Sequence, residues 1–362
     1  MIRVSFRVAA AVGLVAALGC PGAPVAPDGA LEWGIAIHGG AGRIPRDIDE
    51  QRRSGYLSSL EAALDHGRRR LERGATAVEV VEEVVRLMED DPNFNAGRGA
   101  VFTRDGGHAL DASIMDGRDR ACGAVAGVTT VRHPITLARR VMERSPYVLL
   151  AGAGAEAFAD VEAVERVDPT WFDTDRRLRS LREFLAGQGD DEPRGTVGVV
   201  ARDRAGDLAA GTSTGGLTGK RWGRVGDSPI VGAGTWASNG TCAVSATGTG
   251  EEFIRHAVGR TIAALVEFGE IDCAGAAARV VGETLAPGDG GVIVVDAAGR
   301  ATFAFNTAGM LRGAADSGGR FETAIWECAF RIRTPRGTAD GSGRCRRPSR
   351  RPSTRGDRPC VG

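Results

Sequence analysis

A three-residue loop in the middle of the chain does most to narrow the possible folds. It joins two apolar runs, residues 196–203 and 207–214, and its sequence is Arg204-Ala205-Gly206. A short loop with glycine where the backbone must turn left-handed is typical of a β-hairpin. We therefore predict two adjacent antiparallel strands at the centre of the molecule.

The register of this hairpin brings two threonines together. Counting outward equally from Ala205, Thr196 lies opposite Thr214. Opposed residues have Cβ atoms about 4.5–5.5 Å apart, so the two hydroxyls are expected to meet. The other face of the first strand carries Val197, Val199 and Ala201, which suits burial under helices.

Thr196 follows Gly195 and a polar, turn-prone stretch, residues 187–193. Cleavage between Gly195 and Thr196 would give Thr196 a free α-amine, whose unperturbed pKa is about 7.7–8. Hydroxyl and base would then lie on one residue, which is how an N-terminal threonine is activated as a nucleophile. The alternative is an ordinary strand-edge threonine, because β-branched residues are common in strands.

Composition sets broad limits on the class of protein. The chain has 362 residues, with 46 basic and 46 acidic side chains, which fits one large or two small globular domains. Zero net charge and few aromatics give no sign of nucleic-acid binding. Residues 328–362 carry ten arginines but only two acidic residues, and we expect this tail to be disordered, either binding anionic surfaces or arising from a frameshift.

The first twenty residues are typical of an export signal. Arg3 and Arg7 precede an apolar stretch, residues 8–19, that is too short to span a bilayer. The stretch ends at Cys20 in a sequence that resembles a bacterial lipobox, so we expect export to the cell envelope or periplasm with a possible lipid anchor there. A cleaved signal without lipid, or a wrongly assigned start codon, remains open. Residues 21–31 would form a leader linker.

The seven cysteines form no C-x-x-C pair, so a zinc site is not expected. Three lie in apolar contexts and are predicted to be small core residues. A disulfide between Cys345 and Cys360 is conceivable in an exported protein.

Periodicity predicts an alternation of strands and helices. Thr76 and Glu79 form a capping box that opens a helix, and residues 164–195 look like a flexible linker. The other predicted strands are 33–38, 100–103, 109–115, 121–128, 292–296 and 301–305, and the other predicted helices are 48–73, 134–143, 251–268 and 272–285. This order suggests two stacked sheets with helices on their outer faces.

Two segments after the hairpin could bind a zwitterion and an oxyanion. Arg224 offers a planar fork for a carboxylate, and Asp227 can accept hydrogen bonds from an ammonium group. The alternative is a local ion pair between them. Further on, residues 247–250 lead into a helix whose free N–H groups would favour developing negative charge, with Thr247 as a further donor. Ordinary capping by Thr249 and Glu252 is the alternative there.

A third segment, residues 91–99, could turn several carbonyl groups around a hard cation, although on the residues alone a plain turn explains it better.

Together these segments strongly resemble the plant-type asparaginase/isoaspartyl peptidase family of N-terminal-nucleophile hydrolases, in collinear order over about residues 32–327. The matching segments are residues 37–42, 94–97, 110–117, 123–128, 195–198, 212–216, 223–229, 231–234, 247–250 and 305–307.

The resemblance implies an α+β fold, a four-layer αββα sandwich, and self-cleavage into an α subunit (32–195) and a β subunit (196–327). Thr196 would be the nucleophile, oriented by Thr214 and supported by Asn95. Thr247 and the N–H of Gly248 would hold the oxyanion. The implied substrate-binding residues are Asn95, Arg224, Val225, Gly226, Asp227, Thr247, Gly248, Thr249 and Gly250.

The resemblance also implies no organic cofactor, a dimer of αβ units, and a structural sodium ion. The sodium would be held by main-chain carbonyls of Met88, Glu89, Asp91, Phe94, Ala96 and Arg98.

The expected reaction is hydrolysis of L-asparagine to L-aspartate and ammonia, or of β-aspartyl dipeptides. A glycosylasparaginase, which splits the sugar–asparagine bond, is one alternative, and a non-catalytic envelope lipoprotein that keeps the fold as a binding module is another.

Overall fold

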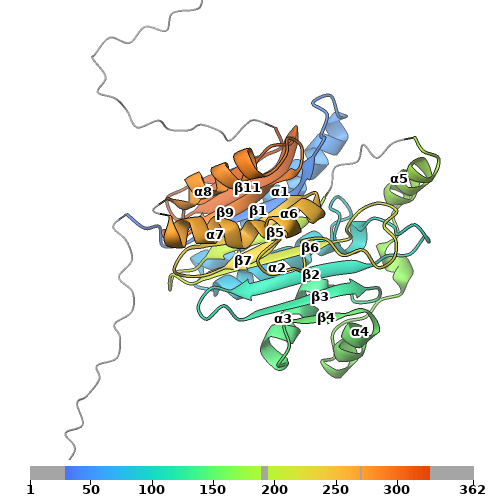
Figure 1. The fold of residues 1–362 in the computed structure, drawn as a ribbon, viewed down its shortest axis with the longest axis horizontal. Helices are drawn as coiled ribbons and strands as arrows, with labels where there is room; N and C mark the ends of the chain where they lie inside the picture. Colours follow the sequence, from blue (N-terminus) through green and yellow to red (C-terminus); the bar gives the residue numbers. More distant parts are fainter. Residues whose placement is uncertain (1–28, 189–194, 270, 327–362) are drawn as a thin grey trace, which may run out of the picture. The chain divides into compact units, whose positions relative to one another are not determined.

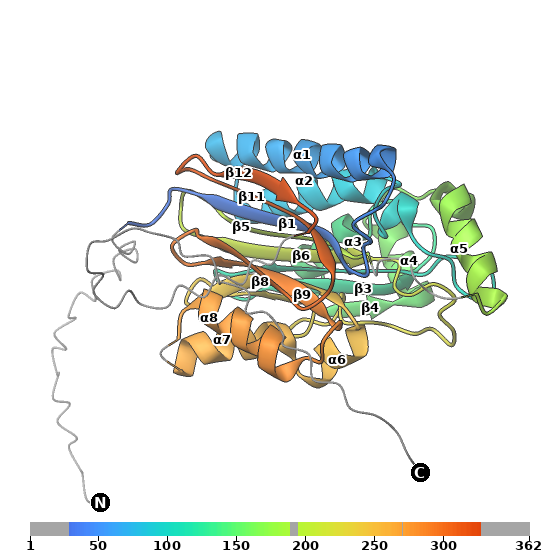
Figure 2. The same cartoon turned by 90° about the horizontal axis from the view of Figure 1, so that it is seen from above.

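Two β-sheets packed face to face form the centre of the molecule. The computed structural model describes residues 29–188, 195–269 and 271–326. Helices cover both outer faces of the sheet pair, as Figure 2 shows with α1 and α2 on one side and α6, α7 and α8 on the other. The predicted four-layer αββα sandwich of the α+β class is confirmed.

The larger sheet holds eight strands in the order β12-β11-β1-β5-β6-β2-β3-β4, and only the pair β3–β4 is parallel. Its strands are β1 (Gly34–Gly42), β2 (Leu110–Asp116), β3 (Cys122–Val128), β4 (Leu149–Ala151), β5 (Val197–Arg202), β6 (Leu208–Thr214), β11 (Gly309–Asp316) and β12 (Phe321–Ala324). The hairpin strands β5 and β6 therefore lie in the middle of this sheet (Figure 1).

The smaller sheet is antiparallel, in the order β10-β9-β8-β7. Its strands are β7 (Thr235–Ala237), β8 (Cys242–Gly248), β9 (Gly290–Asp296) and β10 (Ala301–Phe305). Strands β5 and β6 pack against β8, so the start of the hairpin faces the second sheet.

The helices fall into two groups according to the sheet that they cover. Helices α1 (Glu50–Glu72), α2 (Ala77–Asp90) and α3 (Pro134–Arg144) pack on the larger sheet, and α7 (Val258–Phe268) and α8 (Cys273–Arg279) pack on the smaller one. The remaining elements are α4 (Gly152–Val161), α5 (Asp175–Leu185), α6 (Gly250–Arg255), the 3-10 turns Gly97–Gly99 and Pro169–Phe172, and the π turn Val280–Thr284. Three apolar clusters fill the interfaces, one between the sheets and one under each helix layer.

The hairpin has the predicted register. Val197 pairs with Ser213, and Gly198 pairs with Thr212. Gly206 has a φ of 90°, the left-handed conformation that the loop required. Val197, Val199 and Ala201 belong to the cluster beneath the helices of the larger sheet, as predicted.

The capping box of α2 is also confirmed. The side chain of Thr76 accepts the backbone N–H of Glu79, and the Glu79 carboxylate accepts the N–H of Thr76 at 3.0 Å. This reciprocal pair fixes where α2 begins, and α2 ends at the segment that carries Asn95.

Several predicted elements need correction. Residues 100–103 form no strand, because only Thr103 makes an isolated bridge, to Lys220. The stretch 164–195 is not a simple linker, since it contains the turn Pro169–Phe172 and the amphipathic helix α5. Thr174 caps α5 by accepting the N–H of Arg177, a local signal that the polar composition concealed.

Two boundaries also differ from the prediction. The helix predicted over 251–268 is broken into α6 and α7 by Ala257, whose φ of 44° is left-handed. Strand β1 continues past His38 to Gly42, with a register shift between His38 and Gly40. That irregular end matters because it brings small residues of β1 to the end of β8.

Several expectations lie outside the described residues. They are the export signal 1–20 with Cys20, most of the leader 21–31, the tail 328–362 and the Cys345–Cys360 pair. Among the described residues, Cys122, Cys242 and Cys273 are free thiols. No helix in the described ranges combines the length and the hydropathy needed to cross a bilayer.

Candidate active site

The two threonines of the hairpin meet as the register predicted. Thr196 lies directly before β5, and its hydroxyl donates to Oγ1 of Thr214, at the end of β6, over 3.0 Å. Thr214 also accepts the N–H of Gly216 at 3.0 Å. The Thr196 hydroxyl is therefore held from one side, on a residue that is only partly buried.

Asn95 fixes the turn after β6. Its amide nitrogen donates to the carbonyl of Gly216 at 2.8 Å, and its side-chain oxygen accepts the N–H of Val101 at 2.9 Å. A Cβ placed on Gly195 would lie 3.1 Å from the Cβ of Asn95, so the Gly195–Thr196 bond passes close to this side chain. Asn95 thus supports the Thr214 turn and borders the predicted cleavage site.

The predicted oxyanion segment lies at the end of β8. Thr247 is fully buried, and its hydroxyl accepts the N–H of Ala41 at 3.3 Å, which joins the irregular end of β1 to β8. Gly248 has a φ of 154°, and a Cβ there would lie 2.0 Å from the carbonyl oxygen of Asp289. Only glycine fits this position.

The alternative for this segment, ordinary capping by Thr249 and Glu252, is wrong. Thr249 occupies the N-cap position of α6, but its side chain makes no capping bond, and its ψ of 91° differs from the 153° of Thr76. The carboxylate of Glu252 pairs with Arg255 instead. Ordinary capping therefore does not explain this segment.

Arg224, Asp227 and Gly250 converge on one small space. A Cβ on Gly250 would lie 2.8 Å from Nη2 of Arg224 and 2.9 Å from Oδ1 of Asp227. The missing side chain of Gly250 thus leaves room between a guanidinium and a carboxyl group. Gly226 serves the same loop, because a Cβ there would lie 2.8 Å from Nη1 of Arg224. Val225, between them, is half-buried.

The alternative of an ion pair between Arg224 and Asp227 is wrong. Arg224 pairs with Glu251, with two hydrogen bonds of 2.9 Å to the carboxylate. Asp227 is 5% exposed, and its Oδ2 has no hydrogen-bond partner. Burial raises the pKa of Asp227 to about 7, with Arg224 acting in the opposite direction. A buried carboxyl with an empty acceptor is poised to receive a cationic donor.

The loop after α2 already uses two of the carbonyl groups named in the sodium prediction as hydrogen-bond acceptors. The carbonyl of Asp91 already accepts the N–H of Phe94, and that of Ala96 accepts the N–H of Gly99, both at 3.2 Å. A Cβ on Gly97 would lie 2.2 Å from the carbonyl oxygen of Glu89. Within the described ranges, no cluster of three His, Cys, Asp or Glu side chains could bind a metal ion.

The side chain of Glu89 was not expected to matter, yet it lies fully buried beneath β6. Its Oε1 accepts the hydroxyl of Ser213 at 2.6 Å and the N–H of Ile135 at 3.1 Å, while Oε2 has no partner. Burial raises the pKa of Glu89 to about 8, so this carboxyl is mainly protonated at neutral pH. It holds β6 from below, one residue before Thr214.

His38 lies in the segment 37–42 that matches the family, but the sequence assigned it no role. The structure places it, fully buried, between Thr196 and β8. Its Nδ1 lies 2.9 Å from the carbonyl oxygen of Thr196, and its Nε2 lies 3.0 Å from the hydroxyl of Ser245. A single histidine flanked by small residues on a buried strand was the available signal.

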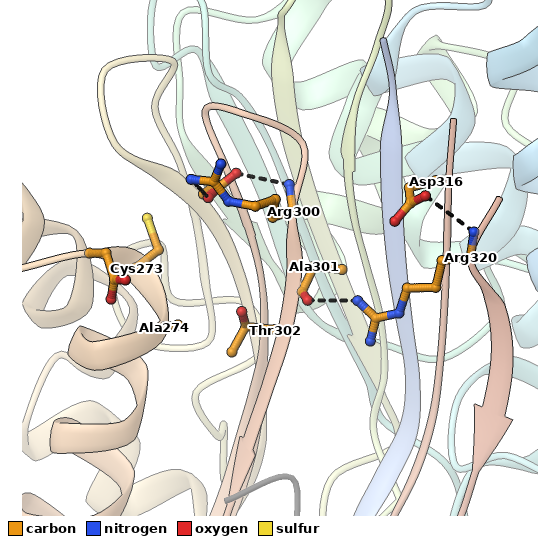
Figure 3. Close-up of a pocket in the computed structure, with 9 residues that line it drawn as sticks. Cys273, Ala274, Arg300, Ala301, Thr302, Asp316 and Arg320 are labelled. Carbon is orange, nitrogen blue, oxygen red and sulfur yellow. Dashed lines mark hydrogen bonds and ion pairs between the residues drawn. The ribbon is translucent and has the colours of Figure 1, made fainter. Parts of the chain in front are cut away.

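A separate hollow of about 360 Å³ lies beside α8 and β10. Figure 3 shows the residues that line it. The charged side chains that line it form ion pairs with each other or hydrogen bonds with the backbone. Arg300 pairs with Asp296 at 2.8 Å, and Arg320 donates to the carbonyl of Ala301 at 2.8 Å. None of the predicted site residues lines this hollow, so it is distinct from the hairpin site.

Comparison with known proteins decides the family. The family model described as asparaginase matches residues 31–325. The chain belongs to the asparaginase family. It is 49% identical over 306 residues to the isoaspartyl peptidase of Salmonella typhimurium, an alignment that covers 81% of this chain and 98% of the relative.

Two further relatives of this asparaginase-family chain are named as an isoaspartyl peptidase and a plant-type L-asparaginase. It is 48% identical over 306 residues to the isoaspartyl peptidase of Escherichia coli, covering 81% of this chain and 95% of that one. It is 40% identical over 290 residues to a plant-type L-asparaginase of Pyrococcus furiosus, covering 75% and 93%.

Proposed function

We propose that this chain is an autoprocessed threonine hydrolase that cleaves L-asparagine and β-aspartyl dipeptides. The observation that carries the proposal is the pairing of the Thr196 and Thr214 hydroxyls at 3.0 Å at the start of a central strand. The convergence of Arg224, Asp227 and Gly250 supports an α-amino acid as the group bound. The names of the relatives agree with this substrate class.

Processing comes first in the proposed mechanism. Oγ of Thr196 attacks the carbonyl of Gly195, the C–N bond breaks, and the acyl group moves from nitrogen to oxygen. Water then hydrolyses the ester, which leaves a carboxylate on Gly195 and a free amine on Thr196. The precursor is inactive in turnover because its base is still part of a peptide bond.

Turnover reuses the same oxygen. Oγ of Thr196 attacks the side-chain carbonyl of the substrate, and the Thr196 amine takes the hydroxyl proton and passes it to the leaving amine. Water then hydrolyses the aspartyl ester and releases L-aspartate. Thr247 and the N–H of Gly248 stabilise the oxyanion in both steps, and Thr214 holds the nucleophile in line.

The substrate's charged groups fit the convergent space beside Gly250. Its α-carboxylate pairs with Arg224 in place of Glu251, and its α-ammonium donates to the empty oxygen of Asp227. The main chain of Val225, Gly226 and Thr249 would complete this site. A glycosylated asparagine or a purely binding role is an outcome of the test below rather than a preferred function.

The test combines processing with substrate choice. Intact mass and N-terminal sequencing of the purified chain should find a new amino end at Thr196. The processed chain should hydrolyse L-asparagine and β-aspartyl dipeptides faster than a glycosylated asparagine. Preference for the glycosylated substrate would make the chain a glycosylasparaginase, and an uncut chain without hydrolysis would leave only a binding module.

Other parts of the proposal concern assembly and location. We propose a dimer of αβ units, export to the envelope and a lipid on Cys20, all of which the same mass measurement and a sizing column can test. A sodium ion on the carbonyls of residues 88–98 would have to share the oxygens of Asp91 and Ala96 with the N–H groups that they already accept. The mechanism above does not depend on it.

Substrate binding should weaken in acid because of Asp227. Its carboxylate attracts the ammonium only when ionised, and its pKa is raised to about 7 by burial. The inhibition constant of L-aspartate should therefore rise about tenfold between pH 8 and pH 6. Asp227→Asn should bind weakly at both pH values. A constant that stays flat in the wild-type enzyme would remove Asp227 from the ammonium site.

A further inference from the structure

A chain of buried hydroxyls runs between the two sheets, and the proposed mechanism does not use it. It begins at His38, whose Nδ1 meets the carbonyl of Thr196, and passes through four side chains that are all fully buried. Its links are His38–Ser245 at 3.0 Å, Ser245–Thr212 at 2.7 Å, Thr212–Thr235 at 2.6 Å and Thr235–Ser113 at 2.8 Å.

The direction of this relay follows from what each atom can donate. A carbonyl oxygen only accepts, so Nδ1 of His38 must carry the proton that faces Thr196. Burial lowers the pKa of His38 to about 3, so the imidazole is neutral and its Nε2 must accept. Ser245 therefore donates to His38.

The next two hydroxyls then fall into one order. Because the only proton of Ser245 goes to His38, Thr212 donates to Ser245 and Thr235 donates to Thr212. Hydrogen bonds aligned in one direction polarise and strengthen one another in a dry interior. The relay thus stabilises the Nδ1–H tautomer of His38, in which the Nδ1–H group donates to the carbonyl oxygen of Thr196.

The far end of the relay reaches the substrate loop. Ser113 contacts the hydroxyl of Thr235 at 2.8 Å and donates its only proton to the carbonyl oxygen of Ser228 at 2.6 Å, because a carbonyl oxygen only accepts. Ser228 directly follows Asp227. The relay therefore links the backbone beside the nucleophile to the backbone beside the proposed ammonium site.

Gly198 shows that the strand leaves space for the relay. A Cβ at Gly198 would lie 2.0 Å from Oγ of Ser245 and 2.2 Å from Nε2 of His38. Any other residue at this position of β5 would break the His38–Ser245 contact. The contact is thus built into the strand that follows Thr196.

Thr196 needs such an anchor because it lies just outside the sheet. The first ladder pair of β5 with β6 is Val197 with Ser213, one residue further on. After the proposed cleavage, Thr196 would no longer be held through Gly195. Its carbonyl, held by His38, would then fix how the amine and the hydroxyl of Thr196 lie relative to each other.

We propose that His38 is a positioning residue for Thr196, and that the donors Ser245, Thr212 and Thr235 of the relay keep it oriented. The inference rests on the proposed function, because it assigns His38 a part in holding that nucleophile. His38 touches neither substrate nor reacting atoms.

The first test measures the effects of substitutions on kcat and on KM separately. His38→Leu should lower kcat roughly 10- to 100-fold, the cost of a slightly misplaced nucleophile, with KM changed less than about threefold. His38→Asn, which keeps an N–H near Nδ1, should recover part of the loss. Ser245→Ala and Thr212→Val should lower kcat by less, because they leave His38 in place. The matched control is Thr241→Val, since the buried Thr241 hydroxyl has no partner.

The second test reads the histidine directly and needs no turnover. Nitrogen NMR of the imidazole should show His38 as the neutral Nδ1–H tautomer from pH 5 to 8, with the resonance assigned by its loss in His38→Asn. An Nε2–H tautomer, or titration near pH 6.5, would overturn the inference.

The two failures can be told apart. The positioning role is refuted, while the proposed function stands, if the wild-type chain is active and His38→Leu has the same kcat as the Thr241→Val control. The same holds if His38→Leu raises KM and leaves kcat unchanged. If the wild-type chain is neither cut nor active, the proposed function fails, and the positioning role of His38 fails with it.

Discussion

Thr196→Ala should yield a chain that is never cut before residue 196 and that hydrolyses neither asparagine nor β-aspartyl dipeptides. The substitution removes the oxygen that attacks in both reactions, so the expected loss of turnover is on the order of 10⁴-fold or more. A denaturing gel and mass spectrum report the cut, and ammonia release reports turnover. The side chain is only partly buried, so the fold should survive.

Thr196→Ser provides the matched comparison, because it keeps the hydroxyl that contacts Thr214. It should be processed and should retain measurable activity. If Thr196→Ala is cut normally, or keeps wild-type turnover, the nucleophile lies elsewhere and the proposed mechanism is refuted.

Arg224→Ala should weaken the use of substrate while leaving self-cleavage intact. The substrate's α-carboxylate would lose two charge-assisted hydrogen bonds, a net loss of about 3 kcal/mol, or about 10²-fold in kcat/KM. Processing involves only the chain's own Gly195–Thr196 bond, which carries no free α-carboxylate. Steady-state kinetics and the rate of precursor cleavage measure the two effects separately.

Arg221→Ala controls for the loss of a positive charge from the same loop. Arg221 is exposed and stacks near the ring of Trp222, so its removal should change kcat/KM little. Equal losses of processing and turnover in Arg224→Ala would instead mean that its pairing with Glu251 is a structural requirement.

Local rules predicted the parts of this fold that local sequence controls. Loop length and Gly206 set the hairpin register, and Thr76 with Glu79 set the start of α2, because these signals act over a few residues. The same reasoning missed α5, whose cap at Thr174 lies in a polar stretch, and the break at Ala257. A left-handed alanine depends on how α6 and α7 pack, which no local pattern encodes.

The candidate site shows the same difference between local contacts, which could be predicted, and contacts between layers, which could not. The meeting of Thr196 and Thr214 followed from pairing within one hairpin. The partners of Arg224, Asp227 and His38 did not, because Glu251 lies in α6 and Ser245 in the second sheet. Contacts between layers depend on how the sheets stack. The family resemblance supplied the roles of Arg224 and Asp227 but none for His38, and the residues alone left an ion pair between Arg224 and Asp227 equally open.

The order of strands in the larger sheet has a consequence for maturation and for refolding after denaturation. Under the proposed scission, β1 to β4 belong to one polypeptide and the other four strands to the second, yet β1 lies between β11 and β5. The two pieces are interleaved, so they would stay together after the cut. Once denatured, however, they would have to find each other by diffusion, whereas the newborn chain folds as one molecule. Maturation would therefore be irreversible. Recovery of the folded protein after denaturation should depend on protein concentration.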